Sequence, residues 1–588
     1  MSCKLYKSVV SICICLISVS SLYGGITGTI SGTVLDKKTG QVLPGAAIIV
    51  EGTTMWAMAD KNGHYLIQNL PAGTYDVSAT MIGYSKLTKK NVQINVDLDT
   101  DLHFELTTKV LPLEEVVVTE KRELIHSEIT SSTYFISGKE INDKFPIDSY
   151  RQAISLLPGV VGDHFRGGRE TEVTYMLDGL PIQGVLSREI SSYFPNSSIV
   201  EMMVQTGGYT AEYGQASSGI VNMVTKDGGN KVEGDVKIYS DFFDTGVTNN
   251  DNTRRLEFNI GGPLTIGLGG PVINANYFVS ADLNLSDTPH RNQMRQVFDS
   301  PVFSNYNINS KLSLDISNNT LLSLQGLVSN WNWRRFDPQW ELNLTGLAEH
   351  RHNSHRISAS LTHTFSPKFF GSLRVANYSY KRSVLGSEKE QPNLIFEDSG
   401  DPKSLIIAGE QPWNEETQED VGIVKLDFVG QLNPSHLLKT GIEIQDYQAT
   451  SQALRFDHLL SRDTDNSITF NKLSSNYEYS PKVYSLYAQD KFDFHGMTAN
   501  LGLRYDFFSP RVTLNSLPDD FVKLRSRLKG PVSSTESENH NPLSPRLGIS
   551  IPLSENERLH ANYGWYYQLP PLYYYYVNNN HNVDSYLP

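Results

Sequence analysis

A strict alternation of apolar and polar residues runs through the chain from residue 231 onward. In residues 500–507 four apolar side chains alternate with four polar or small ones: Leu501, Leu503, Tyr505 and Phe507 against Asn500, Gly502, Arg504 and Asp506. The pattern returns in residues 254–262, 438–445 and 558–567. Because successive side chains of a strand point to opposite faces, this repetition is typical of a transmembrane β-barrel with lipid outside and water inside. A soluble β-sandwich is the alternative that alternation alone leaves open.

The alternating region contains roughly thirteen candidate strands, which begin near residues 231, 254, 274, 308, 320, 355, 369, 421, 436, 482, 497, 544 and 557. A plugged transporter barrel has about 22 strands, bacterial barrels have even strand numbers, and lipid tolerates no open sheet edge. We therefore predict a mainly β fold that ends in a truncated, partial transmembrane antiparallel β-barrel over residues 231–588. The sequence is interpreted as a fragment or an interrupted gene product, and whether its barrel closes is left open.

A basic and then apolar segment begins the chain. Lys4 and Lys7 precede an apolar run from Val9 to Val19, and small residues follow. This order predicts a secretory signal peptide over residues 1–24 that is removed on export, with a buried N-terminal helix as the alternative. All three cysteines lie inside this segment, so the exported chain is expected to contain no disulfide.

The charge and hydropathy of the chain exclude several classes of protein. Lys plus Arg total 50 against 64 Asp plus Glu, so a basic surface for nucleic acid is not expected. No run of about 18 apolar residues follows the signal peptide, so helical membrane spans are not predicted. An aromatic content of 10% with a mean hydropathy of -0.32 suits an outer-membrane barrel, in which lumen-facing residues dilute the lipid-facing ones.

Residues 28–84 contain short β-type runs separated by turn residues. Turns are indicated at Lys38 to Gly40, Pro44-Gly45, Asp60 to Gly63 and Pro71 to Gly73, and this spacing predicts a small antiparallel β-sandwich. The order of these residues, with Gly83-Tyr84 after them, resembles the carboxypeptidase regulatory-like, transthyretin-like domain over residues 27–108. No histidine is followed three residues later by glutamate, the zinc pair of the carboxypeptidases that share this module. The module is therefore predicted to be an accessory domain.

Residues 121–230 carry several glycine-containing blocks. Pro146 to Leu157 predicts a short amphipathic helix. The blocks are Leu157-Pro158-Gly159-Val160, Arg166-Gly167-Gly168-Arg169, Leu177-Asp178-Gly179 and Ala211-Glu212-Tyr213-Gly214. They resemble the plug domain of TonB-dependent outer-membrane receptors. The resemblance implies an α/β plug domain inside the barrel, a location in the outer membrane, and the periplasmic protein TonB as a partner.

Two of these blocks are expected to have defined roles. Glycine permits tight turns and close backbone approach, which a domain wedged inside a barrel requires. In the resembled family, plug arginines pair with acidic residues on the barrel wall. Arg166, Gly167, Gly168 and Arg169 are therefore predicted to form a plug latch, with charges solvated at a turn as the alternative. Asp178 and Gly179 are predicted to form a hairpin turn.

The segment LEEVVVTE, residues 113–120, lies between the sandwich and the plug. In the resembled family this is the position of the TonB box, and an acid, three aliphatic residues and a threonine match its pattern: Glu115, Val116, Val117, Val118 and Thr119. Main-chain hydrogen bonds between this segment and a strand of the partner would hold the two chains together. We expect these residues to contact TonB, and the alternative is an ordinary last strand of the sandwich.

No residues with recognisable catalytic chemistry are found, and no enzyme activity, cofactor or resident metal is predicted. Three long polar stretches, residues 387–420, 454–479 and 509–541, are predicted to be extracellular loops that line a ligand mouth. His350 and His352 would share a face of an extended chain there, whereas His355 would not, which disfavours a metal site.

These features together predict an outer-membrane receptor for TonB-dependent, energy-coupled uptake of a ligand too large or too scarce for porins. The alternatives are an outer-membrane ligand-binding receptor or adhesin without transport, a non-functional truncated product, and a secreted β-rich enzyme. The expected partners are TonB, outer-membrane lipid, an extracellular ligand and a surface lipoprotein, with no nucleic acid. The sequence leaves the ligand open among glycans, siderophores, cobalamin and peptides.

Overall fold

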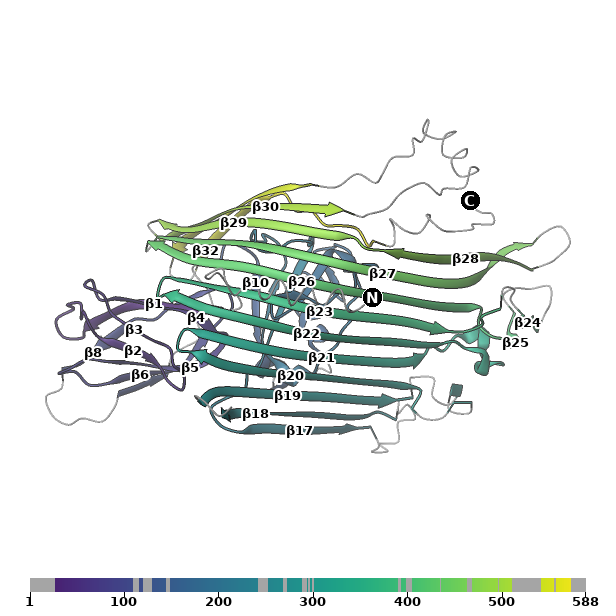
Figure 1. Ribbon diagram of the computed structural model, residues 1–588, viewed down its shortest axis with the longest axis horizontal. Coiled ribbons are helices and arrows are strands. Elements are labelled where there is room, and N and C mark those ends of the chain that lie inside the picture. The colour runs from purple at the N-terminus through teal and green to yellow at the C-terminus, as the bar shows by residue number, and fades with distance from the viewer. Residues whose placement is uncertain are drawn as a thin grey trace.

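The computed structural model describes residues 27–108, 116–119, 129–143, 149–241, 252–267, 272–287, 293–294, 297–298, 301–389, 393–397, 404–433, 435–462, 468–494, 496–509, 541–554 and 557–572. The predicted signal peptide lies outside the described residues. A small sandwich, a plug and a large curved sheet follow one another along the chain (Figure 1).

The first body is a two-sheet β-sandwich with an apolar core drawn from both sheets, which confirms the predicted sandwich. One sheet has the order β4-β1-β7 with β8 also paired to β1, and the other has the order β3-β2-β5-β6-β9. The strands are β1 (Thr27–Asp36), β2 (Ala47–Val50), β3 (Trp56–Met58), β4 (His64–Pro71), β5 (Gly73–Thr80), β6 (Leu87–Ile94), β7 (Asp99–Asp101), β8 (Phe104–Leu106) and β9 (Val116–Thr119).

The prediction that the sandwich is antiparallel is wrong for three strand pairs. β1 pairs with β7 and with β8 in parallel, and β6 pairs with β9 in parallel. Turn residues in the sequence signal hairpins, which are antiparallel, whereas a parallel pair joins strands through a longer crossover that leaves no local signature.

The plug is built on a five-stranded sheet of order β10-β15-β16-β13-β14. Its elements are β10 (Thr133–Ser137), α2 (Gly138–Asp143), α3 (Tyr150–Ser155), β11 (Val160–Val161), β12 (His164–Phe165), η1 (Glu170–Glu172), β13 (Val173–Leu177), β14 (Leu180–Pro181), η2 (Asn196–Ser198), β15 (Ile199–Gln205) and β16 (Gly219–Thr225). The described helix is shorter than the predicted one, and residues 144–148 lie outside the described part.

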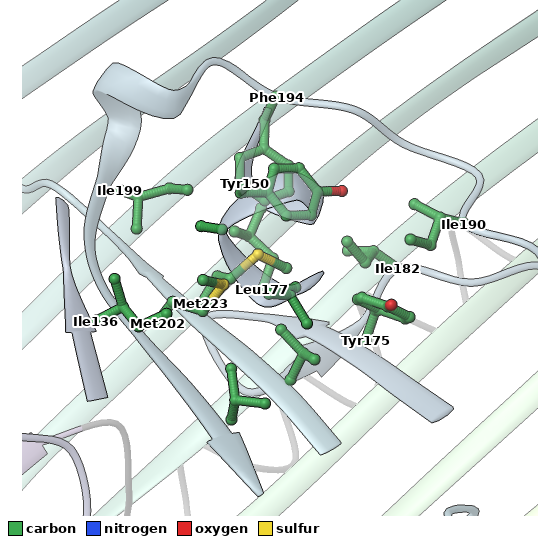
Figure 2. Close-up of a cluster of buried hydrophobic side chains, with 14 of the residues drawn as sticks. Ile136, Tyr150, Tyr175, Leu177, Ile182, Ile190, Phe194, Ile199, Met202 and Met223 are labelled. Carbon is green, nitrogen blue, oxygen red and sulfur yellow. The ribbon is translucent and has the colours of Figure 1, made fainter. Parts of the chain in front are cut away.

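The plug has its own apolar core. Figure 2 shows Ile136, Leu177, Met202 and Met223 from the sheet facing the aromatic ring of Tyr150. That ring stacks on Phe194, with ring centroids 4.8 Å apart and planes 10° apart. The plug is therefore a packed body in its own right, which can keep its shape if it shifts relative to the barrel.

The third body is a fourteen-stranded antiparallel sheet that curves past the plug (Figure 1). Thirteen strands pair in chain order, and β28 pairs with β27 beside that path. The strands are β17 (Glu233–Ser240), β18 (Arg254–Gly267), β19 (Val272–Ser286), β20 (Phe303–Ser317), β21 (Thr320–Arg334), β22 (Glu349–Ser366), β23 (Phe369–Leu385), β26 (Trp413–Asn433), β27 (His436–Arg462), β28 (Ile468–Tyr479), β29 (Lys482–Phe494), β30 (Met497–Ser509), β31 (Leu543–Ser554) and β32 (Glu557–Gly564).

The thirteen predicted strands correspond to the thirteen strands of the main path, but two of the predicted loops contain strands. The stretch 387–420 contains β24 (Ile395–Phe396), β25 (Ile406–Ala408) and the start of β26. The stretch 454–479 contains the end of β27 and all of β28. Where a hairpin extends beyond lipid, both of its faces meet water and the alternation that marks a strand is lost. Residues 510–540 of the third predicted loop lie outside the described part.

The two faces of the large sheet differ as predicted. On β30 the side chains of Leu501 and Leu503 are 48% and 46% exposed on the outer face, whereas Arg504 and Asp506 are buried on the inner face. The inner face meets the plug, so lumen-facing polar residues contact polar groups of another body. Among the described residues, no helix is long and apolar enough to cross a membrane.

Candidate functional site

Within the segment that was expected to be the TonB box, Val116–Thr119 form a strand of the sandwich, β9. β9 pairs in parallel with β6, with Leu87 opposite Val116 and Lys90 opposite Thr119, and it forms the edge of its sheet. Glu115 lies outside the described residues. The structure therefore places Val116–Thr119 as the last strand of the sandwich, and contact with TonB stays a prediction.

The predicted latch arginines have their contacts within the plug. Arg166 donates from Nη2 to the Ser132 hydroxyl at 2.7 Å, and the backbone N–H of Arg169 donates to the Glu172 carboxylate at 3.1 Å. Gly167 has a φ of 80°, a conformation that favours glycine, and a Cβ on Gly168 would lie 2.3 Å from the Cβ of Ser218. In the part of the chain that is described, neither arginine forms an ion pair with a barrel carboxylate, so their role as a latch also stays a prediction.

Asp178 and Gly179 form the predicted hairpin turn between β13 and β14. Both residues have positive φ values, 52° and 74°, as a type I′ turn requires. The turn also reaches the barrel, because the buried Asp178 carboxylate accepts hydrogen bonds from Thr225 of the plug and from Nε2 of Gln325 on β21 at 2.9 Å. A turn residue thus joins the plug to the barrel wall.

Three barrel arginines, and neither Arg166 nor Arg169, join the plug backbone to the barrel wall. Arg356 donates to the carbonyl of Leu177 at 3.3 Å, Arg504 to that of Glu212 at 3.1 Å, and Arg546 to that of Tyr213 at 2.6 Å. All three arginines are buried on the inner face of the sheet. Sequence reasoning missed them, although their place at lumen-facing positions of alternating strands was a signal that could have found them.

The barrel also presents a carboxylate to the plug. Glu419 of β26 is buried and accepts hydrogen bonds from the backbone N–H groups of Val185 and Leu186, the second at 3.2 Å. A Cβ on Gly184 would lie 2.9 Å from this carboxylate, so the plug loop comes close because position 184 is glycine. At this contact the charged partner stands on the barrel and the plug contributes backbone groups.

Six charged side chains form a chain of alternating sign where sandwich, plug and barrel meet. In order they are Arg374, Asp427, Lys425, Glu212, Lys439 and Asp97, with successive charged atoms 3.2, 3.9, 3.6, 3.9 and 2.8 Å apart. Burial, and then the Asp97 carboxylate, raise the pKa of Glu212 to about 7. Burial opposes ionisation of Asp97, but Lys439, the Tyr213 hydroxyl and Lys425 together lower the pKa of that carboxyl. Lys425, Glu212, Lys439 and Asp97 each have a partner of opposite charge on another body, whereas Arg374 and Asp427 pair within the barrel.

The plug leaves little open space beside the barrel wall. A cavity between them has room for water in about 50 Å³, and Gln183, Arg188, Glu212, Glu443, Tyr447 and Arg504 are among the residues that line it. Such a volume holds a few water molecules, whereas ligand pockets occupy about 300–1,000 Å³. A nutrient-sized molecule cannot pass along this cavity while the plug stays in place.

Above the plug, at the sheet end remote from the sandwich, the inner wall is aromatic. Trp331 and Trp333 of β21 contact His350 and His352 of β22, and Trp333 stacks on His350 with ring centroids 5.0 Å apart. Trp413 of β26 packs against His350. Rings from β21, β22 and β26 therefore contact one another along the wall, which we call the aromatic wall. His355 lies on the opposite, exposed face, and the described residues contain no group of three side chains suited to hold a metal ion.

The geometry of a plug inside a polar-lined sheet agrees with comparisons to known families. Residues 292–587 match the family model described as TonB dependent receptor-like, beta-barrel, which covers half of the chain. The chain belongs to the TonB-dependent receptor family. TonB-dependent receptors are outer-membrane β-barrel proteins, so the alternative of a soluble sandwich is excluded. Residues 30–118 match the CarboxypepD_reg-like domain, which confirms the resemblance of the N-terminal module.

Curated relatives of this TonB-dependent receptor share about a quarter of its residues over the matched regions. The TonB-dependent transporter Oar of Myxococcus xanthus is 25% identical over 253 residues, which are 38% of this chain and 23% of that protein. The TonB-dependent receptor P26 of Formosa agariphila is 28% identical over 233 residues, 36% of this chain and 21% of that protein. The matched part of the chain thus spans less than a quarter of the length of these relatives.

Solved structures of the same family share the fold of this receptor. A mutant of the ferric enterobactin receptor PfeA from Pseudomonas aeruginosa has a TM-score of 0.51 at 17% identity, covering 75% of this chain and 63% of that one. A second PfeA mutant, in complex with enterobactin, has a TM-score of 0.51 at 16% identity over 76% of this chain and 64% of that one. At these identities the likeness shows the fold alone.

Proposed function

We propose that this TonB-dependent receptor imports a ligand across the outer membrane by an energy-coupled displacement of its plug. The observation that supports it best is the interface between plug and barrel, where the barrel contributes buried Arg356, Glu419, Arg504 and Arg546 and the plug contributes mainly backbone groups. The polar contacts close the lumen and can be exchanged for contacts with water, whereas Leu180, Val185 and Leu186 of the plug also pack in an apolar cluster with the barrel wall that separation would expose.

The energetics of that interface suit a movable plug. A hydrogen bond to a charged group contributes about 1.5–3 kcal/mol net, because water partly replaces it on separation, and leaving a buried charged group without a partner costs at least as much. The plug is therefore held firmly while the lumen is dry. When water enters, the arginines and carboxylates regain solvent partners and the plug carbonyls are hydrated. A pulling force applied from the periplasm would then need to break these contacts together in a single step.

Residues Glu115 to Thr119 are proposed to be where that force is applied. A strand can be extended by another chain through main-chain hydrogen bonds, whose grip depends little on side-chain identity. β9 lies at the edge of its sheet and has strong β-forming residues. TonB would pair with this strand and pull on the chain that leads into the plug.

The aromatic wall and the facing plug residues are proposed to line the ligand mouth. Tyr193 of the plug packs edge-on against Trp331, so a ligand held at the wall would also contact the plug. Arg455 lies over Trp413 with its guanidinium carbon 4.6 Å from the ring centroid, which adds positive charge. The wall favours ligands with flat or anionic surfaces. Two relatives carry names that describe a transporter and a receptor, which agrees with import but leaves the ligand open.

An in-cell cross-linking experiment tests the proposal. A cysteine at Val117 is paired with a cysteine in the periplasmic domain of TonB, and disulfide formation is measured in energised cells and after collapse of the proton gradient. We expect a cross-link that is lost in Val118→Pro, which removes a backbone donor, and kept in Val118→Ile, which preserves β propensity. A cross-link of equal yield in the proline and isoleucine variants would contradict the assignment of this strand.

A further inference from the structure

The loop after β6 joins the sandwich to the plug and to the barrel at one point. The backbone N–H of Val96 donates to the Glu201 carboxylate on β15 at 2.9 Å. Asp97 accepts from the Tyr213 hydroxyl of the plug at 2.8 Å and forms an ion pair with Lys439 of β27 at 2.8 Å. Val96 also packs with Val224 of the plug. We call residues 95–98 the docking loop.

The shape of the docking loop is fixed by its sequence. Asp97 has a φ of 60°, and aspartate is one of the few residues besides glycine that adopts this conformation readily. The turn directs the carboxylate into the interface, where the side chain of Asp97 is 18% exposed and that of Lys439 is 12% exposed. Ions so far removed from solvent are little screened by salt, and removing one leaves its partner uncompensated.

The sandwich completes the charge balance of the lumen. In the described residues, the chain of alternating sign contains three cations and three anions, and Asp97 is the one that comes from the sandwich. If the sandwich undocks, three cations face two anions, and Lys439 keeps only Glu212 at 3.9 Å. Undocking therefore removes the carboxylate that joins the Tyr213 hydroxyl of the plug to Lys439 of the barrel, and so loosens the plug itself.

The docking loop is also linked to the strand expected to bind TonB. β6 ends at Ile94, directly before the docking loop, and β9 is its parallel neighbour with four residue pairs in register. A pull that separates β9 from β6 removes a strand from the sheet that positions this loop. A pull from the periplasm would therefore act first on the pairing of β9 with β6, and through β6 on the ion pair of Asp97 with Lys439.

We propose that the N-terminal sandwich is a periplasmic lock, in which the docking loop holds the plug closed through Asp97 and the withdrawal of β9 from β6 by TonB releases it. The inference rests on the proposed function for the identity of the pulling partner. The lock itself does not depend on transport, because its contacts are present in the resting protein. Its predicted consequence is that TonB competes with β6 for the same strand and does not add to the free edge of β9.

Hydrogen exchange of the purified full chain tests the lock without a ligand. Asp97→Asn keeps the unusual backbone conformation and removes the charge. We expect roughly tenfold or faster exchange in the peptides that contain residues 95–98 and 209–214, as follows from losing one partner of a buried ion pair. Asp101→Asn is the matched control, because that carboxylate is 63% exposed and pairs with His103 of the same domain. Equal exchange in the two variants would overturn the lock.

A double-mutant cycle separates the lock from a general loss of folding. Lys439→Gln should speed exchange in the same peptides, and Asp97→Asn combined with Lys439→Gln should be no worse than either single change, since the two charges act as one pair. Additive effects would mean that the residues act independently, and the proposal would then be wrong.

A disulfide between the paired strands tests the release step. Lys90 lies opposite Thr119, so Lys90→Cys with Thr119→Cys should join β6 to β9 in the oxidising periplasm. We expect the joined protein to bind the purified periplasmic domain of TonB at least about tenfold more weakly than the Lys90→Cys control, with full binding after reduction. Added TonB domain should speed exchange of residues 95–98 in the reduced form only.

The outcomes of this experiment are distinct. Unchanged TonB binding by the joined protein would show that TonB adds to the edge of β9, and failure of the disulfide to form would contradict the pairing of β9 with β6. If the unmodified chain does not bind the TonB domain at all, the proposed function fails, and the exchange experiment still decides whether the sandwich locks the plug.

Discussion

An alanine at position 214 would place its Cβ 2.4 Å from Nη2 of Arg504 and 2.5 Å from both Cζ and Nε. No atoms approach that closely without movement, and the backbone of Gly214 cannot give way because the neighbouring plug carbonyls are held by the same arginine. The guanidinium group is itself fixed, since Nε lies 3.0 Å from each carboxylate oxygen of Asp506. Gly214→Ala must therefore displace Arg504 from the plug.

The expected cost follows from the bonds that are lost. A hydrogen bond to a charged group contributes about 1.5–3 kcal/mol, and Arg504 makes one such bond to the Glu212 carbonyl at 3.1 Å and a longer one to Ala211 at 3.4 Å. We expect a loss of about 3 kcal/mol in the free energy of plug docking, or roughly a hundredfold in the docked population. The matched control is Gly229→Ala, where an added Cβ would have no contact shorter than 3.9 Å.

The assay is hydrogen exchange of residues 209–214 in the purified chain, together with its thermal unfolding. Gly214→Ala should speed exchange of this segment, while Gly229→Ala should not. In a protein that already carries Arg504→Ala, an alanine at position 214 has no guanidinium group to displace. Gly214→Ala should then change the exchange of residues 209–214 much less. The reasoning is refuted if Gly214→Ala exchanges like the unmodified protein, or if its effect is the same with and without Arg504.

Three further predictions concern other parts of the interface. Because the pKa of Glu212 is raised to about 7 from an ordinary 4.5, the folded state binds an extra proton between these values and loses stability as pH rises through them. This group alone should make the free energy of unfolding about 2 kcal/mol higher at pH 5.5 than at pH 8, and Glu212→Gln should remove that contribution. Glu419→Gln should destabilise the protein less than Glu419→Ala in thermal unfolding, because an amide oxygen still accepts from the plug backbone; equal effects would contradict this. Arg504→Gln should speed plug exchange far more than Arg166→Gln, whose arginine bonds to one hydroxyl within the plug, and the reverse order would restore the latch predicted from the sequence.

The strands could be predicted from the sequence because lipid imposes a repeating constraint. Every lipid-facing position must be apolar, so the alternation around Leu501 and Leu503 is visible without knowing any partner. The same reasoning failed for β28 and the end of β27, which were predicted to be parts of a loop. Turn positions such as Asp178-Gly179 were equally readable, because the backbone conformation of a tight turn restricts the residue types.

The contacts of the candidate site could not be predicted in the same way. Which lumen-facing arginine meets which plug carbonyl depends on the register between two bodies that are far apart in the chain, such as Arg504 and Glu212. The resemblance suggested charged plug residues against barrel carboxylates, whereas the barrel supplies most of the charges. The parallel pairing of β9 with β6 was similarly hidden, since a strong β-forming segment is compatible with several partner strands.

The measurement that tests the central claim most directly is accumulation of labelled nutrients by cells that produce the full chain, with and without a functional TonB. A panel of a ferric siderophore, cobalamin, an oligosaccharide and a peptide covers the ligand classes that the sequence leaves open. We predict that at least one probe accumulates above the level of cells lacking the chain, and that this accumulation disappears when TonB is deleted or the proton gradient is collapsed. Accumulation that is unaffected by the loss of TonB would contradict energy-coupled import by this protein.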